Sequence, residues 1–212
     1  MDTVKTRAYQ TTNLSKYQCD HPFVIERVGD FFDSLIELVA LVEPSYVLDI
    51  GCGEGFDIKN VCERGEISLA HCCGLDMNLR ALKMAQELLI AFPFDAIQGD
   101  IHHLPLKLDR FDIILCLEVL EHLECPEGVL REISRHYSGY CVFSVPNEPL
   151  YRLTRLLLFG RNIRQLGDHP EHVNHWSRSG FVRLIGKHFV IDRVVTPFPW
   201  TIVLCRRREV TR

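Results

Sequence analysis

The sequence lacks any long apolar run: nowhere in its 212 residues does a stretch approach the ~20 apolar residues of a membrane-spanning helix. Segment 1–16 is polar and has no apolar core, which argues against a secretory leader. The sequence also lacks an excess of positive charge, because 28 acidic side chains outnumber 24 basic ones and give a formal net charge of −4. We therefore expect no membrane span, and the charge disfavours nucleic acid as a partner.

Paired cysteine motifs are absent as well. The chain has nine cysteines, an odd number, and none of them form a C-x-x-C pattern. Several stand in apolar runs, which is typical of buried free thiols. This usage predicts a reducing, cytoplasmic location without structural disulfides.

The remaining composition is that of an ordinary globular protein, with 47% hydrophobic and 25% charged residues and no internal repeat. Residues 1–21 are polar and show no periodicity, so we expect a flexible N-terminal arm there. From Val24 to Val42 apolar side chains recur at helical spacing, and Pro44 ends this pattern. A single domain over 22–212 is the natural expectation for this length.

One stretch combines a buried strand with a glycine-rich turn. Residues 46–50 have the apolar, β-favouring content of a strand that is covered on both faces. Glycines 51, 53 and 55 follow at alternate positions, and a helical pattern begins near Phe56. Such a turn allows a ligand to approach the backbone closely at a helix N-terminus. The spacing is D-x-G-x-G-x-G and differs from the G-x-G-x-x-G of dinucleotide-binding folds. A tight turn without a ligand is the alternative.

The segment from Asp49 to Gly55 resembles the first motif of class I S-adenosylmethionine (SAM) dependent methyltransferases. In that family the glycine loop passes under the methionine portion of the cofactor. The later alternation of strands and helices, closed by a hairpin over 189–206, matches the family's sheet. The resemblance implies an α/β, Rossmann-like fold: a seven-stranded sheet with helices on both faces and an antiparallel last strand.

Two acidic residues stand where this cofactor would need them. Asp76 ends the second predicted strand, 21 residues beyond Gly55, and suits the ribose hydroxyls; it could instead cap the helix predicted over 79–91. Asp100 corresponds to the family's adenine contact, or it only caps a turn. The resemblance implies a cofactor-binding set made of Asp49, Gly51, Cys52, Gly53, Gly55, Asp76, Met77, Asp100, Ile101, Leu117 and Glu118.

A cluster of carboxylates and a histidine follows the strand predicted over 110–117. Glu118, Glu121 and His122 are spaced i, i+3 and i+4, which on a helical turn puts them on one face. Together with His172 they could bind Mg²⁺, Mn²⁺ or Zn²⁺. Two alternatives stay open: His122 faces the substrate without a metal, or the segment is structural.

Two groups within the family resemble this chain at these points. The ubiquinone-biosynthesis O-methyltransferases carry a similar E-x-x-E-H. The small-RNA 3′-terminal 2′-O-methyltransferases carry E-x-x-E-H and later D-H-x-x-E-W-[ST], whose metal-binding histidine aligns with His172. This chain departs from that second segment at Glu171 and His175.

The sequence therefore predicts an enzyme that transfers a methyl group from SAM to a small-molecule acceptor, through a hydroxyl oxygen. His122 is the first candidate for the base, followed by His172 and His169. Aromatic side chains of an acceptor pocket could come from Tyr9, Tyr17, Phe198 and Trp200. Alternatives are a metal-dependent RNA 3′-terminal 2′-O-methyltransferase and a SAM-binding protein that transfers nothing.

Overall fold

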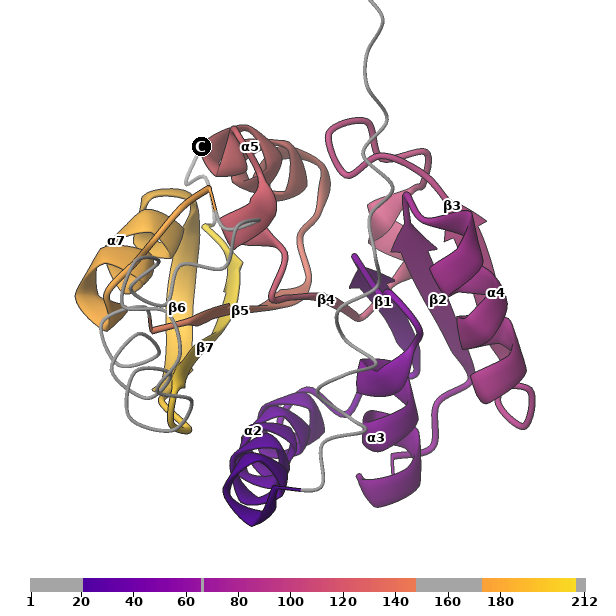
Figure 1. Cartoon of the computed structure of the whole chain (residues 1–212). Coiled ribbons are helices and arrows are strands. Elements are labelled where there is room, and N and C mark those ends of the chain that lie inside the picture. Colours follow the sequence, from indigo (N-terminus) through magenta and orange to yellow (C-terminus); the bar gives the residue numbers. More distant parts are fainter. Residues whose placement is uncertain (1–20, 66, 148–172, 209–212) are drawn as a thin grey trace, which may run out of the picture.

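A computed structural model describes residues 21–65, 67–147 and 173–208. Its strands form one seven-stranded sheet in the order β3-β2-β1-β4-β5-β7-β6, which confirms the predicted fold (Figure 1). Strands β1 to β5 run parallel to one another, and β7 is antiparallel to both of its neighbours, β5 and β6. The strands span Tyr46–Ile50 (β1), His71–Asp76 (β2), Phe94–Gln98 (β3), Ile113–Leu117 (β4), Tyr140–Pro146 (β5), Phe189–Val195 (β6) and Trp200–Arg207 (β7).

Helices cover both faces of the sheet (Figure 1). One face carries α2, α3 and α4, and the other carries α5 and α7. These helices span Pro22–Ala40 (α2), Phe56–Arg64 (α3), Leu79–Leu88 (α4), Pro126–His136 (α5) and Arg178–His188 (α7). Because apolar side chains alternate between the faces of each central strand, two separate hydrophobic cores form. All five residues of β4 are buried, as expected for a strand covered on both sides.

The boundaries of some elements differ from the sequence prediction. The predicted fourth strand, 110–117, begins only at Ile113, because a short 3₁₀ turn, η1 (Leu108–Arg110), precedes it. Between them the Asp112 carboxylate accepts hydrogen bonds from the N–H groups of Ser45 and Tyr46, both at 2.8 Å. This contact commits Asp112 to joining the starts of β4 and β1. The helix predicted over 79–91 ends at Leu88.

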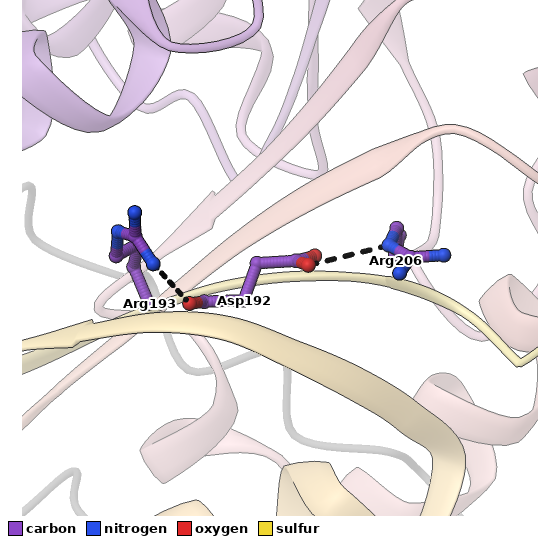
Figure 2. A network of polar contacts seen from close by, with 3 residues as sticks. All are labelled: Asp192, Arg193 and Arg206. Carbon is purple, nitrogen blue, oxygen red and sulfur yellow. Dashed lines mark hydrogen bonds and ion pairs between the residues drawn. The ribbon is translucent and has the colours of Figure 1, made fainter.

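Strand β6 forms one edge of the sheet and contains a β-bulge. Ile191 pairs with Cys205 and Arg193 with Leu204, so Asp192 is the extra residue in the bulged strand. Figure 2 shows the Asp192 carboxylate directed at Arg206, whose Nε donates to it at 3.2 Å, while Arg193 donates to the Asp192 carbonyl. The Asp192–Arg206 bond thus links β6 and β7 at the bulge.

Two expectations concern residues that the structure does not describe. Of the predicted arm, 1–21, only His21 lies among the described residues, and Tyr9 and Tyr17 lie outside them. His169 and His172 likewise lie outside the described residues. Within the described ranges, no helix is long and apolar enough to cross a membrane.

Candidate functional site

The predicted cofactor residues gather where β1, β2 and β4 end. These strands are neighbours and parallel, so their carboxyl ends meet at one edge of the sheet. The turn after β1 has a left-handed backbone at each of its glycines, with φ of 79°, 52° and 83° at Gly51, Gly53 and Gly55. Gly55 is also the residue that caps the start of α3. The glycine turn therefore points a helix N-terminus toward this edge.

At Gly51 the protein itself, besides any ligand, requires glycine. A Cβ atom there would collide with the side chain of Val119, which follows β4. The segment after β4 consequently packs directly against the glycine turn, which brings the E-x-x-E-H cluster next to the predicted cofactor loop. Sequence spacing alone does not reveal this contact, because Gly51 and Val119 are far apart in the chain.

Asp76 ties the glycine turn to the end of β2. One carboxylate oxygen accepts from the Gly53 N–H at 3.0 Å and the other from the Asn78 N–H at 2.7 Å. The cap of α4 is Asn78, whose side chain accepts from the N–H groups of Arg80 and Ala81. The alternative role for Asp76 as that helix cap is therefore wrong, and the sequence prediction missed Asn78.

Asp49 lies beneath the turn with its side chain buried. It is 1% exposed, and its Oδ2 has no hydrogen-bond partner among the described residues. Burial, followed by the charges of Asp57 and Asp76, raises the pKa of Asp49 well above its usual range. Burial also raises the pKa of the Cys52 thiol, so this cysteine is a packing residue and not a nucleophile. A buried carboxylate of this kind suits a cationic ligand group.

The predicted cofactor residues Met77, Asp100 and Ile101 follow β2 and β3. Met77 is 64% exposed, whereas Ile101 is buried. Asp100 caps a turn, since its carboxylate accepts from the His102 N–H at 2.9 Å, and this bond, with the nearby histidines, lowers the pKa of Asp100. The turn-capping role of Asp100 is real; its contact with adenine stays a prediction. His102 and His103 are exposed on the surface.

Glu118 does not share a helical turn with Glu121 and His122. Its φ is 57°, in the left-handed region, and the 3₁₀ turn η2 (Leu120–His122) begins only after Val119. The prediction that the i, i+3, i+4 spacing places all three side chains on one helical face is therefore wrong. The chain turns sharply at Glu118, where β4 ends, before the 3₁₀ turn begins.

The Glu118 carboxylate is directed toward β5 and β7. Oε2 accepts from the indole N–H of Trp200 at 2.7 Å, and Oε1 accepts from the Ser144 hydroxyl at 3.3 Å. The Glu118 N–H donates to both the carbonyl and the hydroxyl of Ser144, each at 3.1 Å. Neither Trp200 nor Ser144 was assigned this role from the sequence. No short-range pattern could reveal it, since 82 positions separate Glu118 from Trp200.

The other two members of the cluster have different environments. Glu121 is buried and its backbone carbonyl accepts from the N–H groups of Val173 and Asn174, whereas His122 is exposed. Within the described ranges, no group of three or more His, Cys, Asp or Glu side chains is arranged to hold a metal ion. The residues in view therefore do not fit the predicted four-ligand site, and its fourth member, His172, lies outside them.

Comparisons with known proteins agree with this geometry. A family model described as a methyltransferase domain matches residues 48–143. A ubiquinone biosynthesis O-methyltransferase of Coxiella burnetii (strain Dugway 5J108-111) is 28% identical over 171 residues, covering 71% of this chain and 68% of that protein. The protein of the same name from Aeromonas salmonicida (strain A449) is 33% identical over 92 residues, covering 42% of this chain and 37% of that protein.

A solved structure supports the fold over nearly the whole chain. Magnesium protoporphyrin IX methyltransferase from Synechocystis PCC 6803, with bound S-adenosylhomocysteine (SAH), superposes with a TM-score of 0.66 at 20% identity. The match covers 93% of this chain and 95% of that one. With the glycine turn, Asp76 and the seven-stranded sheet in their expected places, these likenesses support a class I SAM-dependent methyltransferase.

Proposed function

We propose that this methyltransferase transfers its methyl group to a small-molecule acceptor, through a hydroxyl oxygen. The observation that carries the proposal is the likeness to two ubiquinone biosynthesis O-methyltransferases, one of which aligns over 71% of this chain. The E-x-x-E-H segment supports it, because this segment packs against the glycine turn through Val119 and Gly51. The acceptor would therefore be met beside the cofactor loop.

The residues at the strand ends fit the cofactor. SAM supplies an activated methyl on a sulfonium. In our proposal the glycine turn holds the methionine portion, Asp76 accepts from the ribose hydroxyls, and Met77 with Ile101 contacts the adenine. The buried, unpartnered Oδ2 of Asp49 supports a cationic ligand group nearby, since a positive charge would offset the cost of burying that carboxylate.

His122 is the proposed general base. Its exposed side chain is the one imidazole of the E-x-x-E-H cluster, and it lies on the turn that follows Val119. A histidine accepts a hydroxyl proton effectively near neutral pH, and such assistance typically contributes about 10²- to 10⁴-fold in rate. In our proposal this base meets the acceptor beside the cofactor loop, so that the acceptor oxygen can be held in line with the transferable methyl.

Methyl transfer to defined acceptors tests the proposal. The protein is incubated with methyl-labelled SAM and either 3,4-dihydroxybenzoate, a short RNA with a free 3′ end, or no acceptor. We expect label in the catechol and a loss of roughly 10²-fold or more in His122→Ala, with little change in the surface control His102→Ala. Label in the RNA alone would favour the RNA methyltransferase. SAM binding without transfer to either acceptor would favour a non-catalytic protein.

A divalent ion at Glu118, Glu121, His122 and His172 stays a separate prediction. It rests on the E-x-x-E-H sequence pattern alone, since the described members of the cluster are not arranged to hold an ion. If the ion takes part, EDTA suppresses transfer, added Mg²⁺, Mn²⁺ or Zn²⁺ restores it, and His172→Ala reproduces the effect of EDTA. Transfer that is unchanged by exhaustive chelation, with His172→Ala fully active, would remove this prediction and leave the His122 proposal intact.

A further inference from the structure

Glu118 holds a backbone conformation that requires support. With φ at 57° it lies in the left-handed region, which a residue with a side chain adopts only at an energetic cost. Such conformations persist where the surrounding structure fixes them, and they concentrate at functional sites. The conformation of Glu118 sets the direction in which the chain leaves β4.

The support comes from β5 and β7. Ser144 on β5 accepts from the Glu118 N–H and donates its hydroxyl to the carboxylate. Trp200 on β7 donates its indole N–H to the same carboxylate at 2.7 Å, a length typical of a bond to a charged acceptor. Charge-assisted bonds of this kind are about twice as strong as neutral ones, so Trp200 is a major part of the support.

Trp200 is itself firmly placed. It is 8% exposed and pairs with Pro146 across β5 and β7. Its ring packs on Phe31 of α2 with the ring centroids 5.2 Å apart. Packing that does not involve Glu118 therefore fixes the position of the indole, to which the Glu118 carboxylate is then bound.

The chain that leaves Glu118 leads directly to the proposed base. Val119 packs against Gly51 of the glycine turn, and His122 ends the short turn that comes next. Any rotation of the backbone at Glu118 would therefore move His122 relative to the cofactor loop. From this arrangement we infer that Trp200 is a positioning residue: through Glu118 it sets the orientation of the 118–122 segment against the cofactor loop.

This inference rests on the proposed function only for the role of His122. A double-mutant cycle for methyl transfer uses Trp200→Phe, which keeps an aromatic ring but removes the N–H, and Glu118→Gly, which accepts the left-handed conformation without support. We expect Trp200→Phe to lower kcat roughly 10- to 100-fold, as for the loss of a bond to a charged group, with a smaller change in KM for SAM. In the Glu118→Gly background it should add little.

Effects that multiply in the double variant would overturn the inference, because Trp200 would then act independently of Glu118. The matched control is Trp176→Phe, which changes the other tryptophan of the chain, packed against Phe181. It should leave kcat unchanged. A loss of kcat in Trp176→Phe equal to that in Trp200→Phe would also contradict the inference.

A spectroscopic measurement tests the contact even if no acceptor is found. With two tryptophans in the chain, the indole N–H region of a ¹H–¹⁵N spectrum contains two signals, and Trp176→Phe leaves only that of Trp200. We expect this signal to shift on Glu118→Gln and on saturation with SAH. A Trp200 signal that shifts neither on Glu118→Gln nor on saturation with SAH would overturn the inference. Failure of the transfer assay alone would count only against the proposed function.

Discussion

At the scale of single residues, the aspartates of the proposed cofactor site each have a different environment. Among the described residues, Asp49 is buried with no hydrogen-bond partner at Oδ2, Asp76 accepts from two backbone N–H groups, and Asp100 caps an exposed turn. The same functional group is thus used for charge, for shaping the turn and for local structure. Substitutions at these positions should have clearly different effects.

Asp76→Ala should weaken SAM and SAH binding. The change removes the acceptor of the Gly53 N–H as well as the proposed ribose contact, so we expect a loss of about 1.5–3 kcal/mol, or roughly 10- to 100-fold in Kd. Isothermal titration calorimetry measures it. Asp95→Ala on the neighbouring strand is the control, because its carboxylate is exposed and pairs with His71. Equal affinities in wild type and Asp76→Ala would contradict the assignment.

Asp49→Asn should change how stability depends on pH. Because the folded-state pKa of Asp49 is raised, the folded protein binds more protons than the unfolded chain, so stability falls as pH rises from about 4 through the raised pKa. The asparagine variant should lack this decline. Its free energy of unfolding should rise relative to that of wild type by about 1.4 kcal/mol for each pH unit between the unfolded-state and folded-state pKa values of Asp49. Urea unfolding at several pH values measures it.

The same variant should respond less to the cofactor. If the Asp49 carboxylate faces a cationic group of SAM, saturating SAM should raise the melting temperature of wild type more than that of Asp49→Asn. Asp109→Asn, at an exposed position in η1, serves as the control in both experiments. A parallel pH dependence in wild type and Asp49→Asn would show that this carboxylate is not the group responsible.

At the scale of elements, the glycine turn was predictable and the turn after β4 was not. Three alternating glycines after an apolar strand allow a left-handed backbone at every second position, so the turn over 49–55 could be recognised from the sequence. At Glu118 the local spacing suggested a helical turn, but contacts with Ser144 and Trp200 outweigh that preference. Contacts with residues on distant strands determine the left-handed conformation of Glu118, and a local sequence pattern cannot predict such contacts.

Gly53→Ala should abolish measurable cofactor binding in a protein that still folds. The φ of 52° at Gly53 disfavours any side chain, and the turn it stabilises is bound to Asp76 through the Gly53 N–H. Calorimetry with SAH and circular dichroism separate the two effects. Gly186→Ala in α7 is the matched control, because a Cβ there would meet its nearest neighbour at an ordinary 3.7 Å. Normal SAH affinity in Gly53→Ala would mean that the turn does not cradle the cofactor.

At the scale of the whole molecule, the seven-stranded sheet and the helices on both of its faces were predictable, because the alternation of strands and helices and the closing hairpin match a known family's sheet (Figure 1). The predicted start of the fourth strand was wrong, because the 3₁₀ turn η1 precedes β4. Between them the Asp112 carboxylate binds the backbone at the start of β1. Topology follows from the repeating pattern of the chain, whereas the exact ends of elements depend on individual contacts.

We expect Asp192 to hinder pairing of a second chain with the outer edge of β6. As the extra residue of the bulge it interrupts the regular row of backbone donors and acceptors, and the neighbouring Arg193 adds an exposed charge. Deleting Asp192 should restore a flat edge and promote association into large assemblies, visible by light scattering, whereas Asp192→Ala keeps the bulge and should stay dispersed. The extra residue in β6, whose side chain Figure 2 shows beside Arg206, would thus limit aggregation at high concentration, a task unconnected with methyl transfer.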